Sequence, residues 1–428
     1  MKYSLMKSLL SLTPLEATVL ILAGCLVVYC YLSKRIHILF FILILSASFV
    51  GSTIRGVEGA AALARFLAIV LLLVSAIGTV RLRPSPGCLL FWGYTAIGFI
   101  ALFQAVNLNW QLQRCILLVL LAVAIPYVYS DMSYKSVKTS LAAASMAGAM
   151  FCLLNFIALP AQLGQAARFS GYFKGAASYA VVLGGLLPFA LWGAWRGNNG
   201  VLRILCGLGF LCGVVALVFS GQRTGAVGGL IGSIPLLFML LKRKPAVAFL
   251  LLVIAPLLLG YQLLQQGSAA RGEFLLERYS LSSDSSGRTL IWKRALNEID
   301  RYPLLGRGIG ASENVIENSF HNAYLEVWFN SGLFGLFLFA TSQAFFLWRS
   351  LTLMREPESI EIRSLGALAL GYMVGFVLMC MFESTGAGAS NVNLILYLTV
   401  GVIVSNRDLA ADADHAGSDV LKTREVHA

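Results

Sequence analysis

The chain alternates between long apolar runs and short polar connections. The runs are apolar all round, without the two-residue alternation of a barrel strand, and most approach the roughly 20 residues that a helix needs to cross a bilayer. This pattern predicts an all-α integral membrane protein with about 12–13 transmembrane helices. The predicted spans are residues 15–33, 36–52, 60–80, 88–106, 113–130, 137–159, 175–195, 201–219, 224–241, 246–264, 323–348, 363–382 and 391–405.

The same pattern divides the chain into four parts. Residues 1–264 form an N-terminal set of transmembrane helices, and residues 265–322 form one large polar loop. Residues 323–405 return to the membrane, and residues 406–428 form a polar tail. The long loop is the only extramembrane segment that we expect to be large enough for a fold of its own.

Composition narrows the class of protein. Of the 428 residues, 58% are hydrophobic and 12% are charged, whereas a typical soluble domain has roughly 45–50% and about 25%. A soluble enzyme, a secreted disulfide scaffold and a disordered chain are therefore excluded. The net charge of +12 does not indicate nucleic-acid binding, because the basic residues occur in short groups between apolar runs. The cysteines lack metal-ligand spacing and a single loop histidine cannot build a histidine metal site, so we expect no metal.

The basic groups predict the orientation of the helices. They fall in alternate short loops, most clearly at Lys242–Lys244, and such loops face the cytoplasm. We expect the C-terminal tail on the same side. The unusual polar segments then fall on the external face, at residues 160–174, 220–224, 265–322 and 383–390. Because the cytoplasmic loops are too short to bind a nucleotide, we expect the chemistry on the external face.

One part of the long loop has its own pattern. Residues 289–299 place Leu290, Trp292, Ala295, Leu296 and Ile299 on one face of a helix. This predicts an amphipathic helix at the interface, with Trp292 packed at headgroup depth. A proline then ends the helix, and glycines at 306, 308 and 310 predict a flexible turn region.

Four segments carry a family resemblance: RFSGYFKGAASYA (168–180), SGQRTG (220–225), SGRTLIWKRAL…PLLGRGIG (286–310) and HNAYLEVWFNSGLFG (321–335). In this order they resemble the O-antigen ligase and polymerase superfamily, over most of residues 160–340. The resemblance implies a GT-C-like membrane fold and a metal-independent, inverting glycosyltransferase without a cofactor. It also implies a donor glycan on undecaprenyl diphosphate in the bacterial inner membrane, with an active site facing the periplasm.

Three arginines lie in the matching motifs, at Arg168, Arg223 and Arg288. The planar guanidinium suits phosphate oxygens, and its contacts strengthen as a diphosphate leaves. We expect Arg223 and Arg288 to act in catalysis and Arg168 to bind the diphosphate, with Tyr172 and Lys174 as weaker candidates for the same site. The alternative for each arginine is an ion-paired residue at the membrane interface.

His321 stands where the long loop meets the next span. An imidazole accepts a proton near neutral pH, so we expect His321 to be the general base toward the acceptor hydroxyl. Asn322 either orients the histidine or the sugar, or simply caps the helix. Glu383 either orients His321 or binds sugar hydroxyls; the alternative is a solvated carboxylate at the end of a span.

Two related activities remain open. A ligase transfers the glycan to lipid A–core, whereas a polymerase transfers it to the next lipid-linked repeat unit; the GRTLIW form of residues 287–292 looks like some exopolysaccharide polymerases. A transporter of polysaccharide or lipid is a further alternative. Arg65 is its main candidate for a charge within a span, but the polar residues concentrate in the external loops, and this disfavours transport.

Overall fold

The computed structural model describes residues 35–54, 57–76, 84–129, 132–159, 162, 169–197, 199–243, 288–316, 320–356, 359–385 and 391–406. Two predicted spans (15–33 and 246–264), the first part of the long loop, the tail beyond residue 406, and Arg168 lie outside these residues.

Helices account for nearly all of the described chain. In order they are α3 (Ile36–Ser48), α4 (Val57–Ala76), α5 (Pro86–Ile100), the 3-10 helix η1 (Ala101–Gln104), α6 (Leu108–Tyr129), α7 (Tyr134–Phe156), α9 (Ala176–Arg196), α10 (Gly200–Ser220), α11 (Arg223–Arg243), α15 (Arg288–Ile299), α16 (Ala311–Val315), α17 (Ala323–Met354), α18 (Ile360–Phe382) and α19 (Val392–Ser405).

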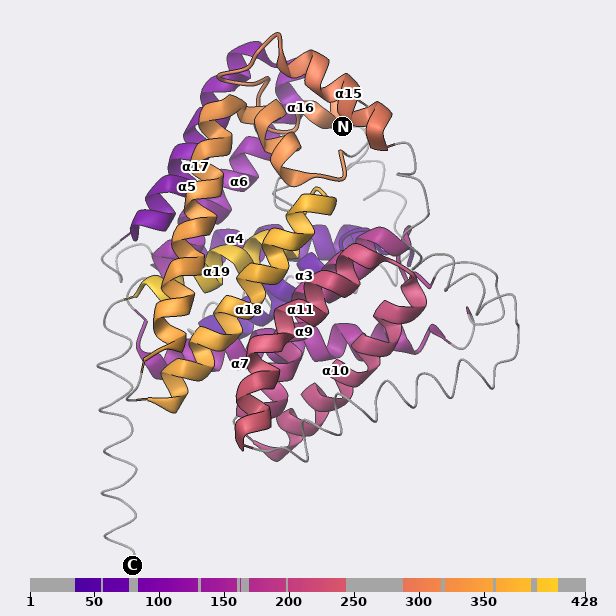
Figure 1. Ribbon diagram of the computed structural model, residues 1–428, viewed down its shortest axis with the longest axis vertical. Coiled ribbons are helices and arrows are strands. Elements are labelled where there is room, and N and C mark those ends of the chain that lie inside the picture. Colours follow the sequence, from indigo (N-terminus) through magenta and orange to yellow (C-terminus); the bar gives the residue numbers. More distant parts are fainter. Residues whose placement is uncertain are drawn as a thin grey trace, which may run out of the picture.

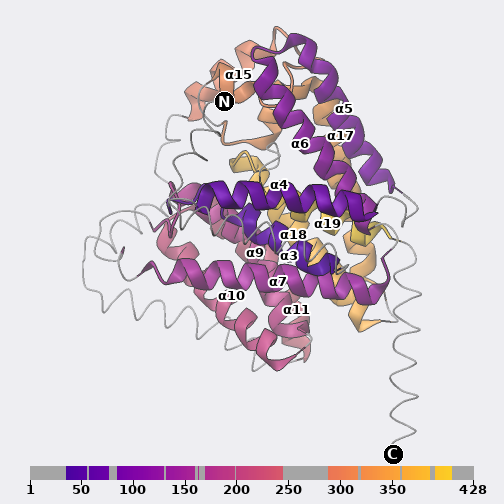
Figure 2. The ribbon, with the colours of Figure 1, turned by 180° about the vertical axis from the view of Figure 1, so that it is seen from behind.

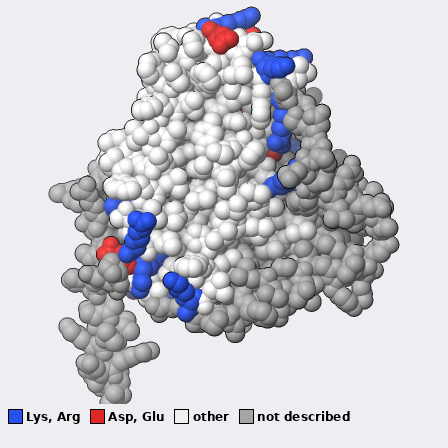
Figure 3. All heavy atoms as spheres, in the orientation of Figure 1, with Lys and Arg blue, Asp and Glu red and all other residues white. Residues whose placement is uncertain are grey.

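The predicted fold class is confirmed. Within the described ranges, nine helices are long and apolar enough to cross a membrane, and α3 and α19 are shorter apolar helices. Each of these helices overlaps one predicted span. On the face shown in Figure 3, Lys and Arg side chains gather at two ends of the molecule, and the surface between them is largely uncharged.

Glycines allow the helices α9, α11 and α18 to pack closely together. Gly225 of α11 lies against Ala180 and Gly184 of α9, while Gly228 of α11 lies against Gly375 of α18. Small residues let helix backbones approach closely within a membrane. The pairs show that α9 and α11 run in the same direction and that α18 runs opposite to them. The first residues of α9 and α11 therefore lie at the same end of the bundle as the last residues of α18, and we call this end the site end.

The remaining helices surround this group. As Figure 2 shows from behind, α3 lies against α7, and α4 contacts both α3 and α6. In Figure 1 the helices α15 and α16 lie at the top, over the ends of α5, α6 and α17. The loop thus sits on one part of the bundle. The Gln111 side chain of α6 donates to the carbonyl oxygen of Arg307 at 2.7 Å, and Arg114 pairs with Glu313 at 2.9 Å.

Helix α17 is broken at Gly332, and the loop repairs the break. Gly332 has φ 67°, a conformation that favours glycine. The backbone N–H groups of Arg307 and Gly308 donate to the carbonyls of Phe329 and Asn330, at 3.0 and 2.7 Å. On the other side of the break, the N–H of Leu333 donates to the carbonyl of Pro303 at 2.8 Å. The polar groups freed by the break are thereby satisfied within the protein, as a membrane environment requires.

This arrangement corrects one expectation. The glycines at 306, 308 and 310 all have positive φ, as turn glycines do. They do not form a loose connection, because a side chain at Gly306 would collide with the backbone of Ser331 and Gly332. The Pro-Leu-Leu-Gly-Arg-Gly segment is a docking element that fixes the long loop to α17.

Candidate functional site

Glu383 lies at the centre of the site. Helix α18 ends at Phe382, and Glu383 follows in an extended conformation with its N–H bonded to the carbonyl of Met379 at 2.8 Å. The residue is only 7% exposed. Its Oε2 lies 2.8 Å from Nδ1 of His321, and its Oε1 lies 3.4 Å from Nη2 of Arg288. We call these three residues the His–Glu–Arg cluster.

The cluster joins distant parts of the sequence. His321 is 62 positions from Glu383, and Arg288 is 95 positions from it. The histidine precedes α17, the arginine begins α15, and the glutamate follows α18. An ionised carboxylate only accepts hydrogen bonds. Nδ1–H of His321 therefore donates to Glu383, and in the neutral imidazole Nε2 is then the nitrogen that carries no proton.

His321 has an unusual backbone. Among the described residues it is the non-glycine residue with positive φ, at 51°, a conformation that costs about 1–2 kcal/mol. Two neighbours hold it. The Phe320 side chain is fully buried against Phe329, with ring centroids 5.2 Å apart, and the Phe320 carbonyl accepts a hydrogen bond from Trp292 Nε1 at 2.7 Å. Strained residues that persist in this way concentrate at functional sites.

Asn322 holds the histidine from the other side. Its side-chain oxygen accepts the N–H of Leu325 at 3.0 Å and so caps the start of α17. The sequence left two roles open for Asn322, and the structure shows it as the residue that caps the helix.

Helix α15 carries two of the site contacts on one face. Arg288 reaches Glu383, and Trp292, four residues further on, reaches the carbonyl next to His321. The amphipathic prediction is right for Ala295 and Ile299, which are buried in a small core of the loop. Leu290 and Leu296 are 58% and 43% exposed, because the buried face of the helix turns toward α16 and α17. Their predicted place at the membrane interface stays a prediction. Trp292 is held by its hydrogen bond to the Phe320 carbonyl, and its predicted headgroup depth stays a prediction.

Arg223 begins α11 at the site end and is half-buried. Because Gly228 lies opposite Met379 and Gly375 of the antiparallel α18, Arg223 lies at the level where α18 ends. The structure therefore brings the start of α11 to the same end of the bundle as the His–Glu–Arg cluster.

Tyr172 and Lys174 lie in a different part of the site end. The Tyr172 carbonyl accepts the N–H of Thr53 at 2.7 Å. Lys174 pairs with Glu58 at 2.7 Å, and both side chains are exposed. These contacts join Tyr172 to the connection after α3 and Lys174 to the first turn of α4, and none of the contacts described for them reaches the His–Glu–Arg cluster.

Sequence reasoning missed two features near the cluster. The first is the hydrogen bond from Trp292, for which the motif gave no signal. The second is Glu326, a carboxylate only 8% exposed that accepts a hydrogen bond from Ser312 at 3.0 Å. Its signal was available, since a glutamate within the apolar run after His321 is unusual for a membrane span. In the described part of the chain, no three His, Cys, Asp or Glu residues are arranged to hold a metal ion.

The chain is similar to a known protein family and to two bacterial proteins. Residues 208–340 match the family model described as O-antigen ligase. The chain is 28% identical to exopolysaccharide production protein ExoQ of Rhizobium meliloti over 267 residues, which cover 58% of this chain and 57% of that protein. It is 32% identical to an O-antigen ligase of Pseudomonas aeruginosa over 173 residues, which cover 38% of this chain and 39% of that protein.

These matches confirm the resemblance. The matched residues run from the middle of α10 through α11 and the long loop into the first half of α17, and they include Arg223, Arg288 and His321. The chain spans little more than half the length of one relative and about two fifths of the other.

Proposed function

We propose that this protein is a membrane glycosyltransferase that moves a glycan from undecaprenyl diphosphate to a hydroxyl of an acceptor sugar. The observation that carries the proposal is Glu383, whose two oxygens contact a histidine and an arginine from separate segments. This geometry supplies a base on one side of the carboxylate and a phosphate-binding cation on the other. The match of residues 208–340 to the O-antigen ligase family model supports the same reaction.

His321 is the general base in this proposal. Its Nδ1–H donates to Glu383, so Nε2 can take the proton of the acceptor hydroxyl. The acceptor oxygen attacks the anomeric carbon, the bond from that carbon to the diphosphate oxygen breaks, and the diphosphate leaves with the electron pair. Attack opposite the leaving group inverts the anomeric carbon. Glu383 fixes the tautomer of His321 and stabilises the imidazolium that forms.

The arginines stabilise the leaving group. Arg288 contacts Glu383 through one nitrogen, at 3.4 Å, and its guanidinium offers five donors. An incoming diphosphate can therefore bind Arg288 while the arginine stays beside the carboxylate. Arg223 and Arg168 contribute further positive charge to the diphosphate in this proposal. These cations take the role that a divalent metal plays in other phosphate sites.

The charge pattern supports an external active site. Arg349, Arg355 and Arg363 lie at the opposite end of α17 and α18 from the His–Glu–Arg cluster, and basic connections face the cytoplasm. We therefore assign the site end to the periplasmic face of a bacterial inner membrane, where a lipid-linked glycan would reach it from the outer leaflet.

The acceptor defines two forms of the activity. Transfer to lipid A–core would make the protein an O-antigen ligase, as the family description suggests. Transfer to another lipid-linked repeat unit would make it a polymerase. The similarity to an exopolysaccharide production protein over 58% of the chain supports the polymerase as the second form of the activity.

A reconstituted assay tests the proposal. The purified protein in liposomes receives the lipid-linked glycan of its host together with either acceptor, and the products are separated by size on a gel. A ladder identifies a polymerase, and a single shift of lipid A–core identifies a ligase. We expect His321→Ala to lower the rate at least about 100-fold, because a general base contributes that much or more.

The matched control is His37→Ala, a change of the half-buried histidine in α3. We expect this variant to keep the wild-type rate. A His321→Ala protein with wild-type activity, or a wild-type protein that transfers no glycan to either acceptor, contradicts the proposed function.

A further inference from the structure

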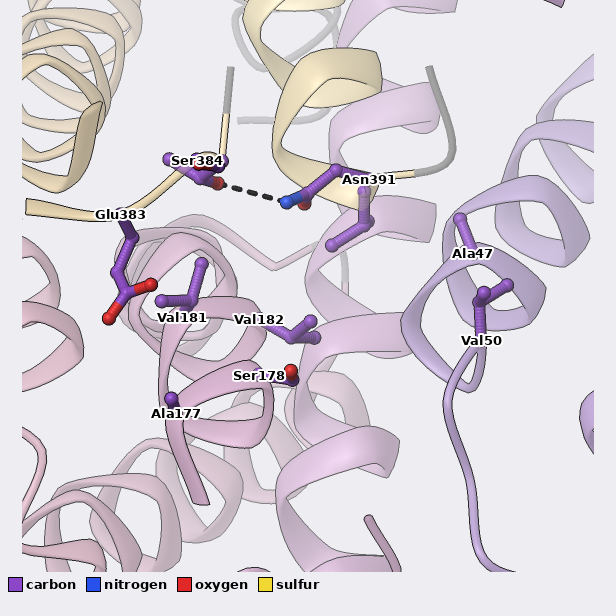
Figure 4. A pocket seen from close by; sticks show the side chains of 11 residues that line it. Ala47, Val50, Ala177, Ser178, Val181, Val182, Glu383, Ser384 and Asn391 are labelled. Atoms are coloured by element: carbon purple, nitrogen blue, oxygen red, sulfur yellow. Dashed lines mark hydrogen bonds between the residues drawn. The ribbon is translucent and has the colours of Figure 1, made fainter. Parts of the chain in front are cut away.

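A pocket of about 270 Å³ opens beside the His–Glu–Arg cluster. Its walls come from the first turns of α9, the end of α3, and the described residues that follow α18 and begin α19. Figure 4 shows Ser178 and Val182 of α9 facing this space, with Asn391 on one side and Ala47 and Val50 on the other.

The polar part of the pocket is held in place by hydrogen bonds. The Asn391 side chain donates to the Thr385 hydroxyl at 3.1 Å, and the buried Asn393 donates to the same hydroxyl at 3.0 Å. The Asn391 side-chain oxygen also accepts the N–H of Asn393 at 2.9 Å. This wall is therefore preformed, as binding sites for small molecules usually are.

The described lining contains hydroxyls, one amide and one carboxylate, and none of these residues is basic. Such a surface does not attract a diphosphate, whose binding requires cations. A polyprenyl chain would suit the alanines and valines, but it would make no hydrogen bond to the Ser178 hydroxyl or the Asn391 amide that line the same pocket. A sugar ring suits both kinds of wall, since its hydroxyls bind polar groups and its C–H faces contact small apolar side chains.

We propose that this pocket binds the ring of the acceptor sugar whose hydroxyl is glycosylated, an inference that rests on the proposed function. Glu383 lines the pocket and also contacts His321. A sugar here therefore lies next to the base that must take its proton, while the diphosphate binds on the arginine side of the same carboxylate. Ser178 and Asn391 then select the acceptor, because polar groups left unpaired by a wrong sugar penalise its binding.

Ser178→Phe tests the proposal by filling the pocket from an exposed position on α9. The control, Ile54→Phe, adds a ring at a residue that is 40% exposed and does not line the pocket. In the reconstituted assay we expect Ser178→Phe to raise the KM for the acceptor at least about tenfold. The KM for the lipid-linked donor should stay within about twofold of wild type, since uniform loss of acceptor binding leaves donor contacts intact. Ile54→Phe should change neither value.

A binding measurement separates this proposal from the proposed function. The detergent-purified protein is examined by saturation-transfer NMR with methyl glycosides of glucose, galactose and N-acetylglucosamine, and in parallel with undecaprenyl diphosphate. We expect at least one glycoside to bind wild type and Ile54→Phe but not Ser178→Phe, with undecaprenyl diphosphate bound by all three. Ser178→Leu, a smaller change, repeats the measurement should the phenylalanine variant not fold.

Other outcomes overturn either the pocket assignment or the proposed function, and they can be told apart. A raised donor KM, or lost binding of undecaprenyl diphosphate in Ser178→Phe, would mean that the pocket binds the lipid-linked donor and not the acceptor sugar. Two results contradict sugar binding in the pocket. The first is an unchanged acceptor KM together with unchanged glycoside binding in Ser178→Phe, and the second is a wild-type protein that binds none of the three glycosides. Glycoside binding in a wild-type protein that transfers no glycan supports the pocket and contradicts the proposed function alone.

Discussion

The two ends of α18 each carry a carboxylate, and the two are held in opposite ways. Glu361, in the first turn, accepts hydrogen bonds from Tyr134 and Arg196 and lies 3.4 Å from Lys138. Glu383, just past the last turn, is 7% exposed and contacts a histidine and an arginine. A negative charge is favourable at a helix N-terminus and unfavourable at its C-terminus.

The difference indicates what each end is for. Glu361 ties α7 and α9 to the favourable end of α18, so it stabilises the fold. Glu383 places a buried carboxylate at the unfavourable end, and Arg288 meets it only at 3.4 Å. A protein keeps such an arrangement where the charge serves a reaction.

Glu383→Gln is expected to have the largest effect on activity. Glutamine keeps the shape of the side chain but removes the charge that stabilises the His321 imidazolium. We expect kcat to fall at least about 100-fold, while the thermal midpoint in detergent stays equal or rises because the unfavourable buried charge is gone. The control is Glu58→Gln, which neutralises an exposed carboxylate at the site end. Activity within about twofold of wild type would remove Glu383 from the mechanism.

Glu361→Gln should give the reverse result. Arg196 and Lys138 lose their carboxylate partner, and we expect a loss of about 1–2 kcal/mol in the free energy of unfolding. The reconstituted transfer rate should stay near that of wild type, because the change lies at the far end of α18. Thermal melting monitors the first quantity, with Glu356→Gln as a nearby control. A large loss of transfer without loss of stability would mean that the two ends do not differ in role.

The sequence predicts the helices of this protein better than it predicts the contacts within the site. The helices α3 to α11 and α17 to α19 follow from apolar runs alone, because the bilayer sets their length and excludes other backbone forms. The residue types of the site, His321 and Arg288, were available from the motifs. The contact of His321 with Glu383 was one of three interpretations of that glutamate, and the contact of Arg288 with it was not predicted. Contacts over 62 and 95 positions depend on how α15, α17 and α18 pack.

Local backbone geometry was the least predictable part. The only sequence mark of the break of α17 is the short Asn330-Ser331-Gly332 step, which does not divide the predicted span 323–348. The polar groups freed by the break are satisfied by hydrogen bonds with residues 303–308, which belong to the preceding loop and not to the helix. The positive φ of His321 depends in the same way on Phe320 and Trp292.

Arg288→Lys tests the other partner of Glu383. Lysine keeps the charge but lacks the planar fork that binds phosphate oxygens in pairs. We expect kcat/KM for the donor to fall about tenfold, the loss of one charge-assisted hydrogen bond, with the KM for the acceptor unchanged. Arg294→Lys, an exposed change on the same helix, serves as the control. An effect confined to acceptor KM would place Arg288 on the acceptor side of the carboxylate.

Trp292→Phe is expected to have the smallest effect, and it tests whether the site depends on the backbone at His321. Phenylalanine keeps the aromatic ring but removes the Nε1–H that donates to the Phe320 carbonyl at 2.7 Å. One neutral hydrogen bond is worth about 0.5–1.5 kcal/mol, so we expect kcat to fall about two- to tenfold while both KM values stay constant. Trp348→Phe, at an exposed position near the other end of α17, should leave kcat unchanged. If Trp292 only packs the loop, its variant will lower the thermal midpoint and leave kcat intact. A lower kcat at an unchanged thermal midpoint identifies Trp292 as a residue that positions His321 through its backbone. Helix α15 then belongs to the functional site together with Glu383.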